Sequence, residues 1–182
     1  MSLVAASPIA GAPSASKRAK RVRNTADKHL GMLLGSELLV VPILTVQEIV
    51  SQQEITPVPR MPAHVRGVIN LRGHVLAVVD LRVRLGLPTV PPTKRTCIVV
   101  ALIPGADGPV VMGMLVDQVT EVLDIPKDMI NVAPDLGGTI NRSHLTGMAR
   151  IGTKVAMILD LARLLAQTAS GLVQPQNSAQ NQ

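Results

Sequence analysis

The chain has 182 residues, enough for one domain of ordinary size or for two small subdomains that pack closely together. It is 47% hydrophobic but contains no Phe, Tyr or Trp, and no run reaches the roughly 18 uncharged apolar residues of a membrane-spanning helix. The one cysteine, Cys97, excludes an internal disulfide and fits a reducing cytoplasm. The N-terminus lacks the pattern of a secretory signal.

The formal net charge of +6 is concentrated at the N-terminus. Residues 1–28 hold six basic residues and one acidic residue, and five of the basic residues fall within residues 17–23. The rest of the chain carries 12 basic and 11 acidic residues and is therefore nearly neutral. The basic tract could attract nucleic acid or anionic lipid, or it could be a solubilising arm.

Both ends of the chain are predicted to be disordered. Residues 1–28 are rich in Ala, Ser, Pro and basic residues and show no periodicity. Residues 170–182 form a tail that is rich in Gln, Asn and Ser. The folded body should therefore span residues 29–169.

Strand patterns dominate this body. Short apolar runs alternate with turn residues, which favours a barrel or a sandwich of many short strands. In chain order we predict a hairpin at 32–43, a strand or turn at 46–49, a proline-rich connector at 57–62, a hairpin at 67–79, a hairpin at 96–116, a strand at 118–123 and a hairpin at 145–159. Short amphipathic helices are expected at 81–85 and 161–165.

The chain also repeats itself. Four residues recur 80 positions later: Gly67, Val75, Asp80 and Leu81 return as Gly147, Val155, Asp160 and Leu161. A second pair of similar segments lies 73 positions apart, Val46-Gln47-Glu48-Ile49 and Val119-Thr120-Glu121-Val122. These repeats predict two similar small β-barrels packed side by side, one centred on each half of the chain.

Few residues have a pattern that favours catalysis. Asp80 and Asp160 end apolar strands, and two carboxylates in a duplicated β-fold could suggest an aspartic-protease type of hydrolase. Each Asp also opens a predicted helix, where its carboxylate would cap free N–H groups, and we favour this interpretation. The four histidines lack the spacing of a helical metal pair, and no phosphate-binding glycine motif is present.

Two charged residues interrupt apolar strands. Glu48 lies in the segment 46–49, and Arg72 lies at the corner of the hairpin 67–79. Each side chain could simply face solvent. Alternatively, the two could form an ion pair that shapes a docking groove and acts through specificity, since exposed pairs stabilise little.

The order of these motifs resembles that of CheW-type chemotaxis coupling proteins over residues 29–165. The matching segments are Leu34-Gly35-Ser36-Glu37, Val41-Pro42-Ile43, Val46-Gln47-Glu48-Ile49, Gly67-Val68-Ile69-Asn70-Leu71-Arg72-Gly73, Val79-Asp80-Leu81-Arg82, Gly113-Met114-Leu115-Val116-Asp117-Gln118-Val119 and Leu145-Thr146-Gly147. The resemblance implies a mainly β fold of two SH3-like five-stranded barrels with short helices. It also implies a cytoplasmic adaptor at membrane-associated receptor arrays, not an enzyme, with no cofactor and no metal.

The partners that the resemblance implies are the regulatory domain of a CheA-type histidine kinase and the cytoplasmic tip of a methyl-accepting chemoreceptor. The implied receptor-binding groove comprises Val46, Glu48, Ile49, Gly67, Arg72, Val119 and Val122. Where the family commonly has aromatic residues, this chain has Met32, Leu39 and Leu85, which should lower the stability of the core unless neighbours repack.

The main alternative is a nucleic-acid-binding β-barrel protein with a basic N-terminal arm. The nearly neutral body weighs against it, and so does the absence of aromatic side chains on which bases could stack.

Overall fold

The computed structural model describes residues 25–105, 108–133 and 140–172. The predicted disorder of residues 1–24 and 173–182 lies outside these residues. Within them the folded body is longer than predicted at both ends. A 3-10 turn η1 (Thr25–Asp27) and the first strand, from Lys28, include residues that we assigned to the arm, and the last helix continues to Leu172, into the predicted tail.

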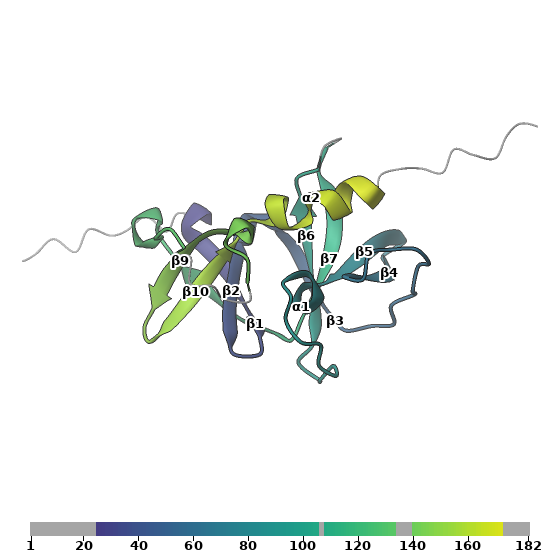
Figure 1. The fold of residues 1–182 in the computed structure, drawn as a ribbon, viewed down its shortest axis with the longest axis horizontal. Coiled ribbons are helices and arrows are strands. Elements are labelled where there is room, and N and C mark those ends of the chain that lie inside the picture. The colour runs from purple at the N-terminus through teal and green to yellow at the C-terminus, as the bar shows by residue number, and fades with distance from the viewer. Residues whose placement is uncertain (1–24, 106–107, 134–139, 173–182) are drawn as a thin grey trace, which may run out of the picture.

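The described strands form two five-stranded sheets (Figure 1). The first sheet, here called barrel 1, has the order β8 (Gln118–Asp124), β1 (Lys28–Leu34), β2 (Glu37–Pro42), β10 (Lys154–Leu159) and β9 (Leu145–Ile151). The second, barrel 2, has the order β3 (Val46–Ser51), β6 (Cys97–Ile103), β7 (Val110–Val116), β5 (His74–Asp80) and β4 (Val65–Leu71). The mainly β fold with two five-stranded units is confirmed.

Short helical segments connect the strands. They are η2 (Ile43–Thr45), α1 (Leu81–Arg84), η3 (Lys127–Met129), η4 (Arg142–His144) and α2 (Leu161–Leu172). Figure 1 shows barrel 1 on the left, barrel 2 on the right and α2 above them. The link η2 carries the chain from barrel 1 into barrel 2.

The prediction that one barrel centres on each half of the chain is wrong. Barrel 2 is built from one continuous segment, β3 to β7, whereas barrel 1 combines the N-terminal hairpin β1–β2 with the C-terminal strands β8 to β10. The parallel pairing of β2 with β10 joins the two ends of the chain within barrel 1. Barrel 2 has the equivalent parallel pair, β5 with β7.

The internal repeat is nevertheless real in three dimensions. Strands β4 and β9 have the same alternation of buried and exposed residues, and each leads through a hairpin into an Asp and a helix. Strands β3 and β8 occupy equivalent edges of their sheets. The strands of barrel 1, taken as β8-β9-β10-β1-β2, match β3 to β7 of barrel 2, so the two barrels are related by a circular permutation.

Both helices begin as predicted. The Asp80 carboxylate accepts hydrogen bonds from the N–H groups of Arg82 and Val83, at 2.9 and 3.3 Å, and Asp160 accepts one from Arg163 N–H at 3.0 Å. These are capping roles, because they satisfy N–H groups that the first turn leaves free. Helix α2 is longer than expected because its apolar residues, including Leu164 and Leu165, are fully buried.

Three apolar clusters of the described residues stabilise the fold. Each barrel encloses a small core of its own, around Val40 and Ile158 in barrel 1 and around Val78 and Val100 in barrel 2. The largest cluster, here called the shared core, lies between the barrels. It includes Leu30, Met32, Leu39, Val99, Ala101, Ile103, Met112, Met114, Leu161, Leu164 and Leu165.

Aliphatic side chains fill the positions where the resemblance led us to expect aromatic ones. Met32 and Leu39 have no exposed surface, and Leu85 is 3% exposed. All three belong to the shared core. The unbranched, flexible side chain of Met adapts to irregular gaps, which explains how a core without rings can still pack closely.

We expect Met32→Ala to lower the free energy of unfolding by about 2–5 kcal/mol, because truncation leaves a cavity in the shared core. Both barrels should still unfold in one transition, since residues from both barrels form that core. Urea unfolding followed by far-ultraviolet circular dichroism measures both effects. The exposed control Val75→Ala should change stability by less than about 0.5 kcal/mol. Two separate transitions would contradict the shared core.

Candidate functional site

The edge strand β3 contains a bulge that sets which of its residues face the other barrel. Val46 pairs with Ala101 and Ile49 pairs with Val99, with a shift of register between them. A bulge adds one residue, so two positions three apart come to face the same side of the sheet. Ala101 and Val99 belong to the shared core, and Val46 and Ile49 therefore point toward that core's margin.

Strand β8 has the same bulge at the equivalent position. Val119 pairs with Met32 and Val122 with Leu30, and the register shifts across Gly31. A side chain at Gly31 would overlap the Thr120 hydroxyl, so glycine allows the bulged strand to approach. Met32 and Leu30 are shared-core residues, so Val119 and Val122 face that core from barrel 1.

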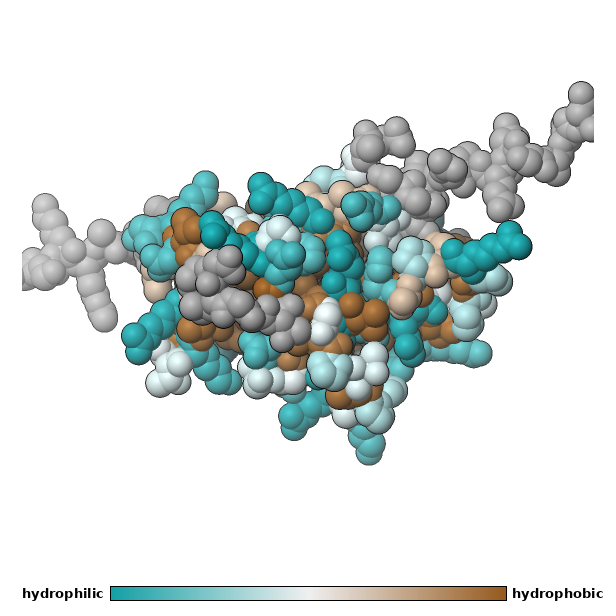
Figure 2. Space-filling model, viewed as in Figure 1, coloured by the Kyte–Doolittle hydropathy of each residue, from teal (hydrophilic) through white to brown (hydrophobic). Residues whose placement is uncertain are grey.

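Val46, Ile49, Val119 and Val122 are called the junction strip. Val46 and Val119 pack against the shared core, while Ile49 is 46% exposed and Val122 is 48% exposed. The two strands are held near the same junction, because η2, which leads directly into β3, contacts both β1 and β6, the strands that pair with β8 and β3. Figure 2 shows apolar residues interspersed with polar ones across this face of both barrels.

The predicted ion pair forms, but on the opposite face of β3. Arg72 Nη2 lies 2.9 Å from Glu48 Oε2, with the Arg72 side chain 79% exposed and that of Glu48 28% exposed. Glu48 pairs with Val100, which belongs to the inner core of barrel 2. The pair therefore joins the edge strand β3 to the β4–β5 turn across the opening of barrel 2.

The β4–β5 turn is tight and conformationally demanding. Arg72 and Gly73 both have positive φ angles, +53° and +87°, as a two-residue type I′ hairpin turn requires. The Asn70 side-chain oxygen accepts a hydrogen bond from Gly73 N–H at 2.9 Å. This turn geometry directs the Arg72 side chain toward Glu48, although arginine rarely adopts a positive φ.

Gly67 supports the same closure of barrel 2. Its φ is +142°, and a side chain there would overlap the carbonyl oxygen of Thr56. Thr56 and Val68 exchange two backbone hydrogen bonds of 2.9 Å, which tie the β3–β4 connector to β4. Glu48, Arg72, Gly67 and this backbone bridge make up what we call the barrel 2 seam.

The seven predicted site residues thus divide into two groups. Four form the junction strip, and Glu48, Gly67 and Arg72 form the barrel 2 seam. Adjacent residues of a strand point to opposite faces, so Glu48 and Ile49 do not line one surface. A ligand that lies on the junction strip would reach the seam only around the edge of β3.

Two features of the junction escaped the sequence analysis. Leu44, on η2, is 69% exposed and lies two residues before Val46 in the chain, so it adds apolar surface at the start of β3. The other is an ion pair between Arg82 and Asp117, described next. The signal for Leu44 was weak, because a single apolar residue in a short link is common on protein surfaces.

Arg82 and Asp117 clamp the two barrels together. Arg82 Nε donates to Asp117 Oδ1 at 2.8 Å, and a second guanidinium nitrogen contacts Oδ2 of the same carboxylate. Asp117 also accepts a hydrogen bond from Gly35 N–H in the β1–β2 turn, at 2.7 Å. The hydrogen bond from Arg82 holds the pKa of Asp117 below its usual range.

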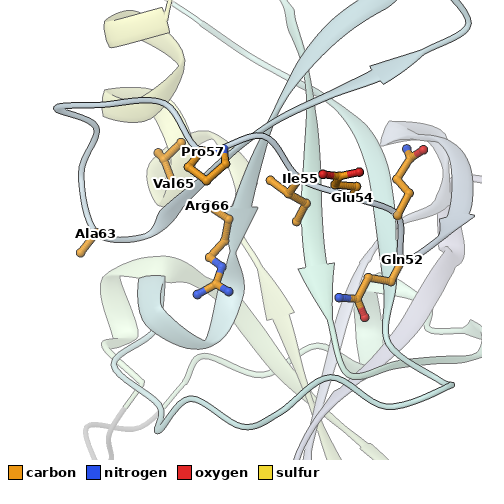
Figure 3. Close-up of a pocket in the computed structure, with 8 residues that line it drawn as sticks. Gln52, Glu54, Ile55, Pro57, Ala63, Val65 and Arg66 are labelled. Atoms are coloured by element: carbon orange, nitrogen blue, oxygen red, sulfur yellow. The ribbon is translucent and has the colours of Figure 1, made fainter.

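Two pockets of the described residues lie away from both groups. One, of about 450 Å³, lies between the β3–β4 connector and β4 (Figure 3). Its lining is mixed, from Ile55 and Val65 to the charged Glu54 and Arg66. Another, of about 530 Å³, lies beside Asp117 and includes Lys94 and Arg95.

The residues that the sequence analysis considered for chemistry have structural surroundings in the described part of the chain. The carboxylates of Asp80 and Asp160 cap helices, and no group of three or more His, Cys, Asp or Glu side chains in these residues could hold a metal ion. Burial raises the pKa of the Cys97 thiol, which disfavours the reactive thiolate. No helix in the described part of the chain is long and apolar enough to cross a membrane.

Comparison with known proteins relates the whole folded body to one family. Residues 28–169 match the model of the CheW-like domain. The chain is 35% identical to the chemotaxis protein CheW of Rhizobium meliloti, over 79% of this chain and 90% of that protein. It is 31% identical to CheW of Klebsiella aerogenes, over 91% of this chain and 96% of that protein.

A solved structure supports the same relationship. The chain matches the crystal structure of the scaffolding protein TtCheW from Thermoanaerobacter tengcongensis with a TM-score of 0.69 and 31% sequence identity. The match covers 77% of this chain and 92% of that one.

We expect Asp117→Asn to lower stability at pH 7 and to flatten its dependence on pH in acid. Because the folded state holds the pKa of Asp117 low, its stabilising effect is present above the unfolded carboxyl pKa of about 4 and is lost as pH falls further. Urea midpoints at pH 7 and pH 3 should differ less in this variant than in the wild type. The exposed control Glu54→Gln should keep the wild-type difference, and equal pH dependence in all three proteins would contradict the clamp.

Proposed function

Because the chain belongs to the CheW-like domain family of chemotaxis scaffold proteins, we propose that it couples the tip of a chemoreceptor to a CheA-type histidine kinase. The proposal makes it a non-enzymatic adaptor in the cytoplasm, at membrane-associated receptor arrays. One surface would bind the receptor tip and another the regulatory domain of the kinase.

The observation that carries the receptor assignment is the junction strip. Two bulged edge strands present Ile49 and Val122 to solvent at the margin of the shared core. A cytoplasmic receptor tip is a helical hairpin, and the apolar face of such a helix suits a hydrophobic surface between two β-barrels. The partly buried Val46 and Val119 would form the base of this surface, and Leu44 would extend it.

The barrel 2 seam has a different part in this proposal. The Glu48–Arg72 pair is exposed and contributes little to stability, about 0–1 kcal/mol. It holds the β4–β5 turn against β3, on the face opposite to Ile49. We propose that the pair sets the position of β3 and offers a charged rim to the receptor, so that it affects specificity more than affinity.

A second partner surface is needed for coupling, because an adaptor must hold two proteins at once. If both partners bind different surfaces of one rigid body, a change in the receptor can reach the kinase through the shared assembly. The shared core favours such rigidity, since it joins the two barrels directly. The contacts with the kinase are proposed at the ends of the barrels without assignment to single residues.

The nucleic-acid alternative gains no support from the comparisons. The described β-barrels present no aromatic platform, since the chain has no Phe, Tyr or Trp. An electrophoretic shift of RNA or DNA that disappears when residues 1–24 are removed would revive it.

We expect Ile49→Arg and Val122→Arg each to weaken binding of a chemoreceptor signalling fragment by at least about tenfold, because each buries a charge in an apolar contact. Val75→Arg is the matched control, since Val75 is 69% exposed on the β4–β5 hairpin. Co-sedimentation with receptor and CheA-type fragments measures binding, and circular dichroism checks the fold. Unchanged receptor binding in both junction-strip variants would contradict the proposal.

A charge swap distinguishes whether the Glu48–Arg72 pair only positions β3 or whether Arg72 also contacts the receptor. Glu48→Arg and Arg72→Glu should each weaken receptor binding, because each places like charges together at the turn. If the pair only positions β3, the double variant should restore binding to within about threefold of the wild type. If Arg72 contacts the receptor directly, the double variant should stay weak. Normal receptor binding by Arg72→Glu alone would remove the seam from the receptor site.

A further inference from the structure

The two barrels close in the same way along the backbone. In barrel 1 the backbone of Asn131 joins β9 through two hydrogen bonds of 2.8 Å, as Thr56 joins β4 in barrel 2. Gly147 packs against the backbone of Asn131 as Gly67 packs against Thr56. The duplicated architecture therefore extends to single residues at these positions.

A histidine lies three residues before each of these glycines. His64 precedes β4, and His144, on η4, precedes β9 and lies 80 positions later in the chain. The carbonyl of His64 accepts a hydrogen bond from Asp80 N–H at 2.8 Å, and that of His144 accepts one from Asp160 N–H at 2.9 Å. The backbone of each histidine is thus fixed at the point where its barrel leads into a helix.

Both histidines belong to a cluster of polar groups that lies against α2. Nε2 of His64 and the hydroxyl of Thr168 on α2 form a hydrogen bond of 2.7 Å, and Thr168 is buried. Segment η4, which carries His144, contacts α2, and Nδ1 of His144 is buried without a hydrogen-bond partner among the described residues. Arg84 Nε, on α1, donates to the carbonyl of Leu164 on α2 at 2.7 Å. His64, His144, Arg84 and Thr168 are called the α2 seat.

The α2 seat opposes positive charge on either histidine. Burial first, and then the charge of Arg84, lower the pKa of His64 and that of His144. In the described ranges, no ion pair joins a carboxylate to either ring. The other charged groups on the surrounding elements are engaged elsewhere or exposed: Asp80 and Asp160 cap α1 and α2, Arg82 pairs with Asp117, Arg163 pairs with Asp160, and Arg60, Arg66 and Arg142 are exposed.

Helix α2 is the element that this seat holds in place. The helix follows β10 of barrel 1, contacts β6 of barrel 2 and lies above both barrels in Figure 1. Leu164, Leu165 and Ala169 have no exposed surface and belong to the shared core. Because one histidine comes from each barrel, a change of charge in the seat acts on the helix from both sides of the junction.

We propose that His64 and His144 form a pH-sensitive latch for α2. At neutral pH both rings are uncharged, and the helix is seated on both barrels. In mildly acidic solution each ring gains a proton, and the new charges lie beside Arg84 with no carboxylate paired to them. The part of α2 that carries Thr168 then separates from barrel 2. This latch goes beyond the proposed function and does not depend on it.

A fall in pH should favour the released helix. The α2 seat holds the pKa of both histidines below the value of about 6.5 in an unfolded chain, so the released state binds protons more tightly. The stabilising effect of the uncharged rings is fully present above about pH 6.5 and is lost as the pH falls through that value.

The test is hydrogen exchange of the full chain at pH 7 and pH 5.5, followed by mass spectrometry and expressed as protection factors. We expect the protection of α2 to fall about three- to tenfold at the lower pH, while that of β7 changes less. The double variant His64→Gln with His144→Gln should lose this pH dependence, because glutamine stays uncharged. His74→Gln, at an exposed histidine of β5, is the matched control and should keep it.

Circular dichroism and urea midpoints at pH 7 establish whether the variants keep the wild-type fold. An equal loss of α2 protection in the wild type and in the folded double variant would overturn the latch. If the double variant does not fold, the wild type alone decides. Protection of α2 that is the same at both pH values, or a loss that is equally large in β7, would then overturn the proposal.

Discussion

The shared core between the barrels is the interaction on which the rest of the structure depends. Each barrel encloses only a small apolar cluster, whereas the cluster between them takes residues from β1 and β2, β6 and β7, and α2. These segments come from both ends and the middle of the chain. Because small isolated domains bury too little apolar surface to be stable, the barrels need one another. The chain therefore forms one unit although its architecture is duplicated.

The same core determines where a binding surface can form. Edge strands normally expose polar or charged residues, which prevents unwanted pairing. Here the bulges in β3 and β8 turn Ile49 and Val122 toward the margin of the shared core. The apolar residues of the junction strip thus extend from the shared core to the protein surface. In the proposed function, this surface would offer the receptor helix a rigid apolar contact.

Duplication also makes the differences between the barrels informative. The backbone closure is the same in both, down to the glycine that packs against the connector. Among the described residues, an ion pair crosses the seam in barrel 2 alone, because its hairpin turn presents Arg72 where the other hairpin has Gly152.

The sequence by itself determined the local features of this protein. The hairpins around Arg72-Gly73 and Gly152-Thr153, the capping Asp80 and Asp160 and the repeat could all be predicted, because turn chemistry and strand alternation depend on neighbouring residues. It also indicated that Glu48 and Arg72 could pair. Only the tertiary structure decided that the two ends of the chain share barrel 1 and that a bulge places Val46 and Ile49 on the same side of β3. Strand partners and bulges depend on contacts between residues far apart in the chain, and a shift of one residue in register reverses the face of every side chain.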